Sequence, residues 1–227
     1  AILNHAVNMY GMKDNVSRKA GTMCKEENKK MEFWTQDEFQ AFLECVADKP
    51  ISYYAFEMLY WTGIREGELL ALTPADFNFE KKTLRINKSY QRLEGKDVIT
   101  DPKTPNSNRT IVMPDFLAVE MENFISSIYG IRDDNRIFTI SKSYLHHEMD
   151  RGAKLAGVKR IRIHGLRHSH ISLLINLGFS ALAIGERVGH EAVDITYHYA
   201  HLFPTVQTDM AAQLETEREA LVNVRKE

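Results

Sequence analysis

The sequence has little cysteine, proline or glycine and no long hydrophobic run. Its two cysteines, Cys24 and Cys45, are too few for a disulfide framework, so we expect a reducing compartment, the cytoplasm. Twelve glycines and six prolines in 227 residues argue against a fibrous or low-complexity chain. No apolar run approaches the about 18 residues that a transmembrane helix needs, so we expect no membrane partner.

The remaining composition is that of a folded globular chain. Hydrophobic residues make up 44 % and charged residues 26 %, which is enough apolar material for a core. The sequence opens with Ala-Ile-Leu-Asn and has neither a Met nor a signal-peptide pattern there. We therefore expect it to be part of a longer protein.

Charge is distributed unevenly along the chain, although the net charge is only −2. Residues 31–80 hold ten acidic and two basic residues, whereas residues 81–110 hold eight basic and three acidic ones. Residues 151–170 hold six basic residues and no acidic one. Separate blocks of one sign are typical of a face that meets a polyanion such as DNA. Solvated surface faces are the simpler alternative.

The pattern of residues predicts a mainly α chain with one small antiparallel β-sheet (α+β). Residues 1–12 resemble the end of a helix, residues 13–30 a linker, and the main domain begins near Met31. Thr35-Gln-Asp-Glu38 is a capping box that predicts a helix start. Two β-type runs, Thr83–Ile86 and Arg109–Met113, lie between Phe77 and Met113 and predict a three-stranded sheet. Further helices are expected near residues 52–62, 66–72, 115–129, 143–156, 165–177, 180–188 and 207–224.

Four short patterns contain residues suited to phosphate chemistry. They are Thr62-Gly-Ile-Arg65-Glu-Gly-Glu68, Lys103 in a proline-bracketed turn, His164-Gly-Leu-Arg167-His168, and Gly189-His190 nine residues before Tyr199. Taken singly, each has an ordinary structural explanation: an exposed ion pair, a solvated lysine, or packing histidines.

Taken together, in this order and at these gaps, the patterns resemble the tyrosine recombinase (phage integrase) family over about residues 31–205. The motifs that carry the resemblance are Thr-Gly-x-Arg-x-x-Glu, Lys-Thr-x-x-Ser-x-Arg, His-x-Leu-Arg-His, Gly-His and Tyr-Ala-His. Integrases of conjugative transposons and temperate phages are the nearest resemblance. One departure is Val188 before Gly189, where the family more often has Leu.

The resemblance implies a role for each matching residue in cutting and rejoining DNA through a 3′-phosphotyrosyl intermediate, without metal, ATP or cofactor. Tyr199 is the nucleophile, His164 its general base and Lys103 the general acid for the departing 5′ oxygen. Arg65, oriented by Glu68, and Arg167 clamp the phosphate, and His190 is a further donor. Guanidinium groups suit this task because each can donate two parallel hydrogen bonds to phosphate. The nine-residue gap favours Tyr199 over Tyr197 as nucleophile.

The resemblance also implies an organisation and partners. Residues 1–30 would be the end of a truncated core-binding domain plus a linker, and residues 31–227 the catalytic domain with an exchange helix at about 207–224. Double-stranded DNA at element ends and target would be the partner, with a tetramer forming through the C-terminal segment in the cytoplasm, at the bacterial nucleoid. Alternatives are a catalytically silent DNA-binding regulator, a chromosome-dimer-resolving recombinase and a metal-dependent phosphohydrolase using His164, His168 and His190.

Overall fold

The structure is a computed structural model and describes residues 2–20, 31–101, 108–189, 199, 214–216 and 218. The chain divides into two units, residues 1–31 and 32–227, which are described separately. The first unit contains α1 (Ile2–Tyr10), where the sequence predicted the end of a helix, and α2 (Val16–Ala20), inside the expected linker. Among the described residues, no helix is long and apolar enough to cross a membrane.

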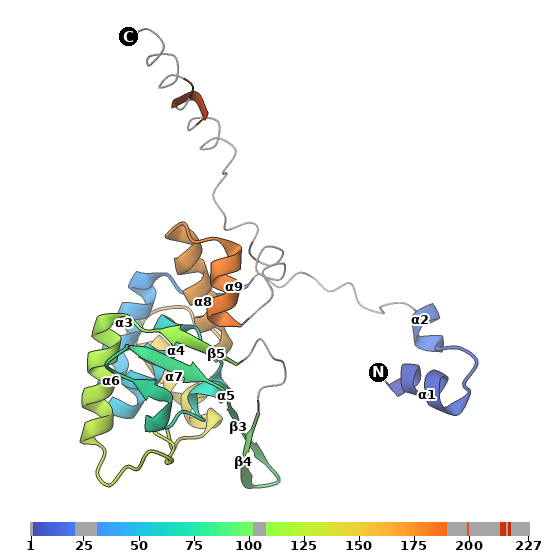
Figure 1. The fold of residues 1–227 in the computed structure, drawn as a ribbon, viewed down its shortest axis with the longest axis horizontal. Helices are drawn as coiled ribbons and strands as arrows, with labels where there is room; N and C mark the ends of the chain where they lie inside the picture. Colours follow the sequence, from blue (N-terminus) through green and yellow to red (C-terminus); the bar gives the residue numbers. More distant parts are fainter. Residues whose placement is uncertain are drawn as a thin grey trace. The chain divides into compact units, whose positions relative to one another are not determined.

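Helices form most of the second unit (Figure 1). They are α3 (Gln36–Val46), α4 (Pro50–Thr62), α5 (Glu66–Leu69), α6 (Asp115–Ser127), α7 (Lys142–Ala156), α8 (Ile163–Asn176) and α9 (Ala181–Val188), with a 3-10 turn, η1 (Pro74–Asp76). The predicted capping box opens α3: the Glu38 amide donates to Thr35 Oγ1 at 3.3 Å, and the Thr35 amide donates to Glu38 Oε2 at 2.9 Å. α5 ends at Leu69, earlier than expected, and the Leu72 carbonyl instead accepts a tertiary bond from the Ile137 amide at 2.9 Å.

The predicted three-stranded antiparallel sheet is present. It consists of β1 (Phe77–Asn78), β2 (Thr83–Ile86) and β5 (Arg109–Val112), in the order β1-β2-β5. Leu84 pairs with Ile111, and both side chains are buried.

The segment between β2 and β5, which we predicted to be rich in turns, contains a second sheet. β3 (Ser89–Leu93) and β4 (Lys96–Thr100) form a two-stranded antiparallel hairpin, so the prediction of one sheet was incomplete. In these two strands Tyr90 is the buried side chain. A strand with one face on a core is identified in a sequence by alternating apolar and polar residues. This alternation is weak in β3 and β4.

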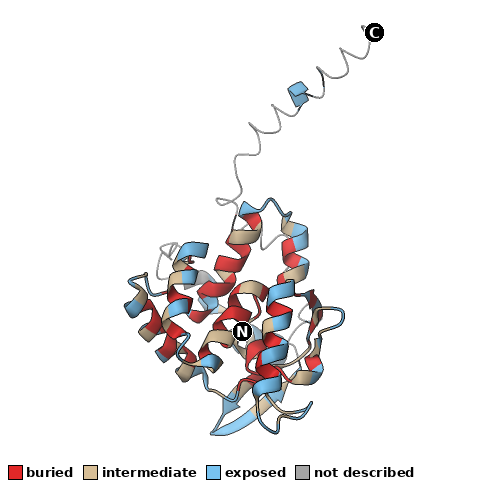
Figure 2. Ribbon diagram, turned by 90° about the vertical axis from the view of Figure 1, so that its left-hand side faces the viewer, coloured by how far each residue is buried: buried red, intermediate tan, exposed pale blue. Residues whose placement is uncertain are grey.

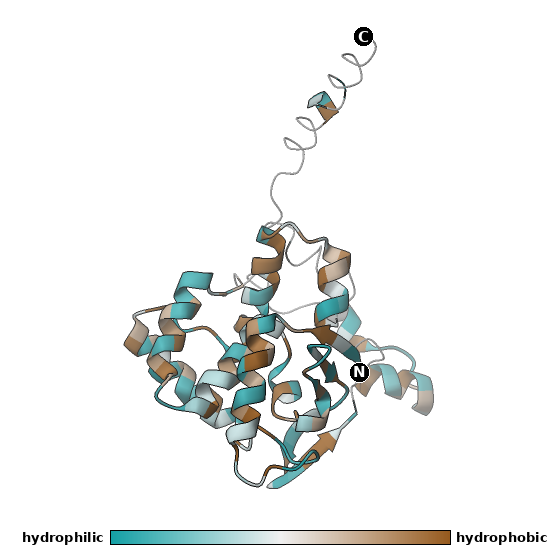
Figure 3. Cartoon of the chain, turned by 60° about the vertical axis from the view of Figure 1, so that its left-hand side comes forward, coloured by the Kyte–Doolittle hydropathy of each residue, from teal (hydrophilic) through white to brown (hydrophobic). Residues whose placement is uncertain are grey.

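The helices surround one hydrophobic core, which confirms the mainly α class with small antiparallel sheets. α3 packs on α7, and α4 packs on both α6 and α8. Figure 2 shows the buried residues concentrated on the inner faces of the helices. Figure 3 shows that single helices carry both hydrophobic and hydrophilic residues, as helices that cover a core do. Aromatic rings pack closely in the core; the rings of Phe39 and Tyr60 stack with centroids 3.7 Å apart.

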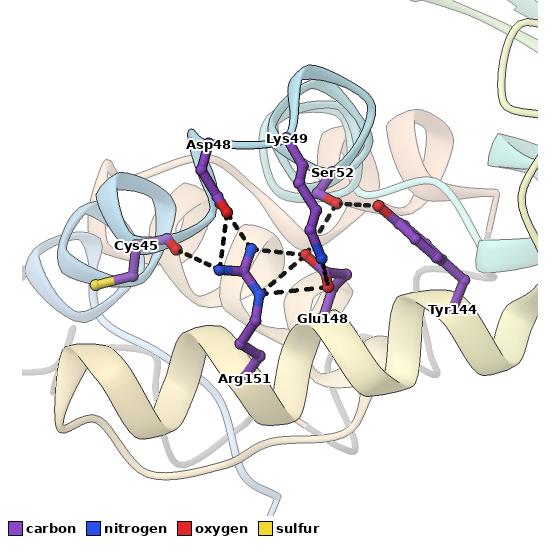
Figure 4. Close-up of polar contacts among 7 residues, drawn as sticks. All are labelled: Cys45, Asp48, Lys49, Ser52, Tyr144, Glu148 and Arg151. Carbon is purple, nitrogen blue, oxygen red and sulfur yellow. Dashed lines mark hydrogen bonds and ion pairs between the residues drawn. The ribbon is translucent and has the colours of Figure 1, made fainter.

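A buried carboxylate joins α7 to the α3–α4 corner (Figure 4). Glu148 accepts from Lys49 Nζ at 2.6 Å, from Arg151 Nη2 at 2.7 Å and from Ser52 Oγ at 3.2 Å. Arg151 also donates to Asp48 Oδ1 at 2.7 Å. Burial raises the pKa of Glu148, but the hydrogen bonds from Arg151 and Lys49 outweigh burial and hold it below its usual value. The network therefore contributes to stability near neutral pH and fixes the helices that frame the core.

A second buried carboxylate, Glu57 on α4, should make the free energy of unfolding depend on pH. Burial, assisted by the charge of Glu120, raises the pKa of Glu57 to about 7. Its contribution to stability is complete below the unfolded pKa and is lost as pH rises from about 4.5 to about 7. We expect Glu57→Gln to raise the free energy of unfolding by about 2 kcal/mol at pH 8 and by much less at pH 5. Urea unfolding at both pH values measures this.

The matched control is Glu122→Gln, on the exposed face of α6. It should leave the unfolding free energy within about 0.5 kcal/mol at both pH values. An equal gain for Glu57→Gln at pH 5 and pH 8 would contradict ionisation as the cause.

Candidate active site

Arg65 lies where α4 ends and α5 begins, and Glu68 orients it as predicted. The chain leaves α4 through Gly63, whose φ of 65° favours glycine. A Cβ at Gly63 would also lie 2.6 Å from the His170 ring. Arg65 Nη1 then donates to Glu68 Oε1 at 2.8 Å, and the Arg65 amide donates to Glu68 Oε2 at 2.8 Å. The Arg65 side chain is 34 % exposed, so solvent and a ligand can reach it.

Arg109, at the start of β5, is a site residue that the sequence reasoning missed. Its guanidinium donates to both Glu68 oxygens, from Nη1 at 3.1 Å and from Nη2 at 2.9 Å. Burial alone would raise the pKa of Glu68, but the bonds from Arg109 and Arg65 hold it below its usual value. Glu68 is therefore a carboxylate shared by two arginines. The motif Lys-Thr-x-x-Ser-x-Arg, which Arg109 ends, could have identified it as a site residue. Its contact with Glu68 joins distant parts of the sequence, so local spacing does not reveal that contact.

Arg167, on α8, is fully buried at 1 % exposure. Its Nη1 donates to the Gly63 carbonyl at 2.6 Å, and its Nη2 donates to the Val188 carbonyl. Burial and the nearby charges of Arg65 and Arg109 lower its pKa to about 9, so the group is still charged at neutral pH. In this structure the Arg167 guanidinium is bound to carbonyl oxygens, and its contact with a phosphate stays a prediction.

Three arginines converge on the C-terminal end of α9. Arg109 Nε donates to the Arg187 carbonyl at 2.9 Å, Arg167 to the Val188 carbonyl, and Arg65 Nη2 to the Gly189 carbonyl at 3.3 Å. The last carbonyls of a helix lack partners within the helix and carry partial negative charge, which explains the attraction. The structure therefore brings Arg65 and Arg167 together, at the carbonyls of Gly189 and Val188.

Tyr199 is buried, at 2 % exposure, and lies close enough to Arg167 to feel its charge. Burial raises the pKa of its phenol above the usual 10, and the charge of Arg167 offsets this in part. The phenol oxygen forms a hydrogen bond with His168 Nδ1. The phenol is therefore protonated at neutral pH, and a base must remove its proton before it can attack phosphorus.

His164 and His168 lie one turn apart on α8, with edge-to-face rings 4.8 Å between centroids. Solvent reaches His164, yet the protein packed around its imidazole, with the charges of Arg167 and Arg65, lowers its pKa. It is therefore neutral near pH 7, as a general base must be.

His170 has a different, internal role. It accepts a bond from Arg187 Nε at 3.0 Å, and burial lowers its pKa to about 3. Its bond to Arg187 joins α8 to α9 and helps to hold α9 in place.

Some predicted residues lie outside the described part of the chain. Lys103 and His190 are among them, as is the rival Tyr197. Of the expected exchange helix at 207–224, residues 214–216 and 218 are described, and they are helical. Within the described ranges, no three His, Cys, Asp or Glu side chains gather as a metal site.

Relatives of this chain are found by sequence and by structure. The model of the phage integrase family matches residues 32–205. The ICEBs1 integrase of Bacillus subtilis (strain 168) is 33 % identical over 217 residues, which covers 89 % of this chain and 58 % of that protein. A "Tyrosine recombinase XerC-like" protein of Caldanaerobacter subterraneus is 25 % identical, over 86 % of this chain and 56 % of that protein. This chain therefore spans less than two thirds of the length of these relatives.

Solved structures share the fold. The Tn1549 transposon integrase, in complex with a circular intermediate DNA, aligns with a TM-score of 0.71 and 21 % identity, over 84 % of this chain and 68 % of that one. The catalytic domain of bacteriophage HP1 integrase aligns with a TM-score of 0.56 and 19 % identity, over 80 % and 94 %. The family model, the 33 % identical relative and the motif residues agree, and the chain belongs to the phage integrase family of tyrosine recombinases.

Proposed function

We propose that this chain is the catalytic part of a site-specific DNA recombinase that serves a mobile element. The observation that carries the proposal is the convergence of Arg65, Arg109 and Arg167 at the end of α9, with the Tyr199 phenol within the influence of the Arg167 charge. Clustered guanidinium charge next to a protonated phenol suits attack on a phosphodiester, because negative charge builds on the phosphate oxygens. Integration or excision of an element is favoured over chromosome-dimer resolution by the likeness to the ICEBs1 integrase.

The proposed reaction has two symmetrical steps. The Tyr199 oxygen forms a bond to phosphorus and loses its proton to His164, while the bond from phosphorus to the 5′ oxygen breaks. Lys103 gives that oxygen a proton. A 5′-hydroxyl of another strand then attacks the phosphotyrosine and gives its proton to Lys103. The bond from phosphorus to the Tyr199 oxygen breaks as His164 returns the proton to the phenol. Arg65, held by Glu68 and partly exposed, contacts the phosphate, and Arg167 is the second guanidinium that donates to it.

Three hydrogen bonds made in this structure must change before attack. Tyr199 is 2 % exposed, so a DNA phosphate cannot touch its oxygen, and the bond to His168 must break. Arg65 and Arg167 must likewise exchange carbonyl oxygens of α9 for phosphate oxygens. We propose that DNA binding exposes the Tyr199 phenol, with self-association through residues 207–224 as the coupled event.

The identity of the base gives a separate prediction. We expect His164→Gln to slow formation of the covalent DNA adduct by about 10²-fold or more, since general-base catalysis contributes about that much. His168→Gln should slow it less, because the His168 bond is broken before attack. Adduct formation rates on one DNA substrate measure both. A larger loss for His168→Gln would transfer the base role to His168.

The proposal is tested by covalent capture of DNA in EDTA. The protein, expressed from its full reading frame, is incubated with a library of nicked duplexes that have a randomised core, and protein-bound DNA is sequenced. The proposal expects enrichment of one motif with a protein attached at a 3′ end. Sequence-specific binding without attachment would instead favour the silent DNA-binding regulator, and cleavage that requires a divalent metal would favour the phosphohydrolase.

A further inference from the structure

Two pairs of aromatic rings pack α6 against α4. The Tyr54 ring of α4 stacks on Phe124 of α6, with centroids 4.2 Å apart. Later in α4, the Trp61 ring packs edge to face on Phe116, which comes earlier in α6, with centroids 5.3 Å apart. The two helices therefore run antiparallel, and the ring pairs determine which residues face each other between them.

Glu57 and Glu120 face each other between the two ring pairs. Glu57 is three residues after the first ring of α4 and four before the second, and Glu120 is four residues from each ring of α6. Residues three or four apart lie on the same face of a helix, so both carboxyl groups lie in the contact between α4 and α6. These two residues form the carboxyl pair.

The carboxyl pair lacks the donors that buried carboxylate oxygens need. Glu57 is 4 % exposed, and Oε2 of each glutamate is buried without a hydrogen-bond partner among the described residues. Burial and the negative charge of Glu120 raise the pKa of Glu57 to about 7, although a bond from Trp61 favours the charged form. Burial raises the pKa of Glu120 as well. Two facing carboxylates repel each other, and a proton on one of them supplies the missing donor.

The titratable groups around the carboxyl pair do not neutralise it. Burial, with the charges of the carboxyl pair, raises the pKa of the Tyr53 and Tyr54 phenols, that of Tyr53 to about 12. Burial raises the pKa of Tyr60 to about 12 as well, with Asp37 of α3 as a further negative charge. All three phenols are therefore uncharged at neutral pH. A divalent cation would need about six oxygen ligands, and the described part of the chain has no group of three metal-binding side chains.

We propose that Glu57 and Glu120 form a proton-binding site, in which one proton is shared between the two carboxyl groups and holds α6 on α4. One carboxyl group carries the proton and donates a hydrogen bond to the other, so the buried oxygens gain a partner. Above the pH at which this proton is lost, two negative charges face each other and the contact between the helices weakens. The site is therefore a pH-sensitive lock between α4 and α6.

The test compares the wild type, Glu57→Gln and Glu120→Gln by urea unfolding of the full chain at pH 5 and pH 6.5. Tryptophan fluorescence reports the second unit, since both tryptophans, Trp34 and Trp61, lie in it. The folded pair keeps its proton up to about pH 7, whereas unfolded carboxyl groups lose theirs near pH 4.5. The ratio of the wild-type unfolding constant to that of either variant should therefore rise by about 20-fold between the two pH values.

The rise should be the same for both variants, because an amide in place of either carboxyl group is a permanent donor to the other. If burial of Glu57 alone were the cause, the ratio would rise for Glu57→Gln and stay constant for Glu120→Gln, which would overturn the inference. A constant ratio for both variants would also overturn it. So would a loss of wild-type stability on addition of EDTA, which would place a cation in the site. Glu122→Gln, on the exposed face of α6, is the matched control and should give a constant ratio.

Discussion

Replacement of Arg109 by methionine is expected to lower the free energy of unfolding by about 3–5 kcal/mol, the usual effect of breaking a buried ion pair by removing one partner. Arg109 and Glu68 are both buried, and the arginine donates to each oxygen of the carboxylate. Without Arg109, the pKa of Glu68 should rise. Because the pKa of Glu68 is held below its unfolded value of about 4.5, the ion pair stabilises the folded state above about pH 4.5. This stability is lost as the pH falls through the folded pKa.

Urea unfolding at pH 7 and pH 4 measures this effect, and the loss should be smaller at pH 4. Arg85→Met is the matched control: Arg85 lies on β2, opposite β5, and its side chain is 55 % exposed. It should change stability by less than about 1 kcal/mol. The double variant Arg109→Met/Glu68→Gln should recover part of the loss. A loss for Arg109→Met that equals the Arg85→Met loss would contradict the shared-carboxylate account.

The second large effect is on catalysis. We expect Arg167→Lys to slow adduct formation by about 10²–10³-fold, the usual loss when one charge-stabilising donor is removed. A lysine keeps the charge, but it cannot bond to the Gly63 and Val188 carbonyls with the spacing of a guanidinium. The rate is measured with saturating DNA, so that weaker binding does not contribute.

Arg160→Lys is the control for Arg167→Lys, since Arg160 is in the same basic stretch and its exposed side chain pairs with Asp150 at 2.7 Å. It should keep the wild-type rate. Thermal unfolding of both variants separates loss of fold from loss of chemistry. A folded Arg167→Lys protein with a near wild-type rate would show that Arg167 only supports α9.

The sequence predicted the local features of this fold and site well, because neighbouring residues determine them. The capping box at Thr35, the end of α4 at Gly63 and the Arg65–Glu68 pair all depend on residues within three or four positions. Periodicity also located the long helices, with ends shifted by at most two residues.

Features that depend on distant contacts could not be predicted in the same way. Arg109 and Glu68 are 41 residues apart, and Arg136 and Leu70 are 66 apart, so no local spacing reveals their bonds. The bond between His168 and Tyr199 likewise joins residues 31 positions apart. The hairpin was missed because its sparse burial gives little apolar alternation.

The central claim is that Tyr199 is the nucleophile, and peptide mapping of the captured DNA adduct tests it most directly. Tyr197 is the informative rival, because it carries the same phenol only two residues away in the sequence. The account predicts a DNA-linked peptide modified at Tyr199 in EDTA, lost in Tyr199→Phe and retained in Tyr197→Phe. An adduct on Tyr197, or one that forms only with added divalent metal, would contradict it.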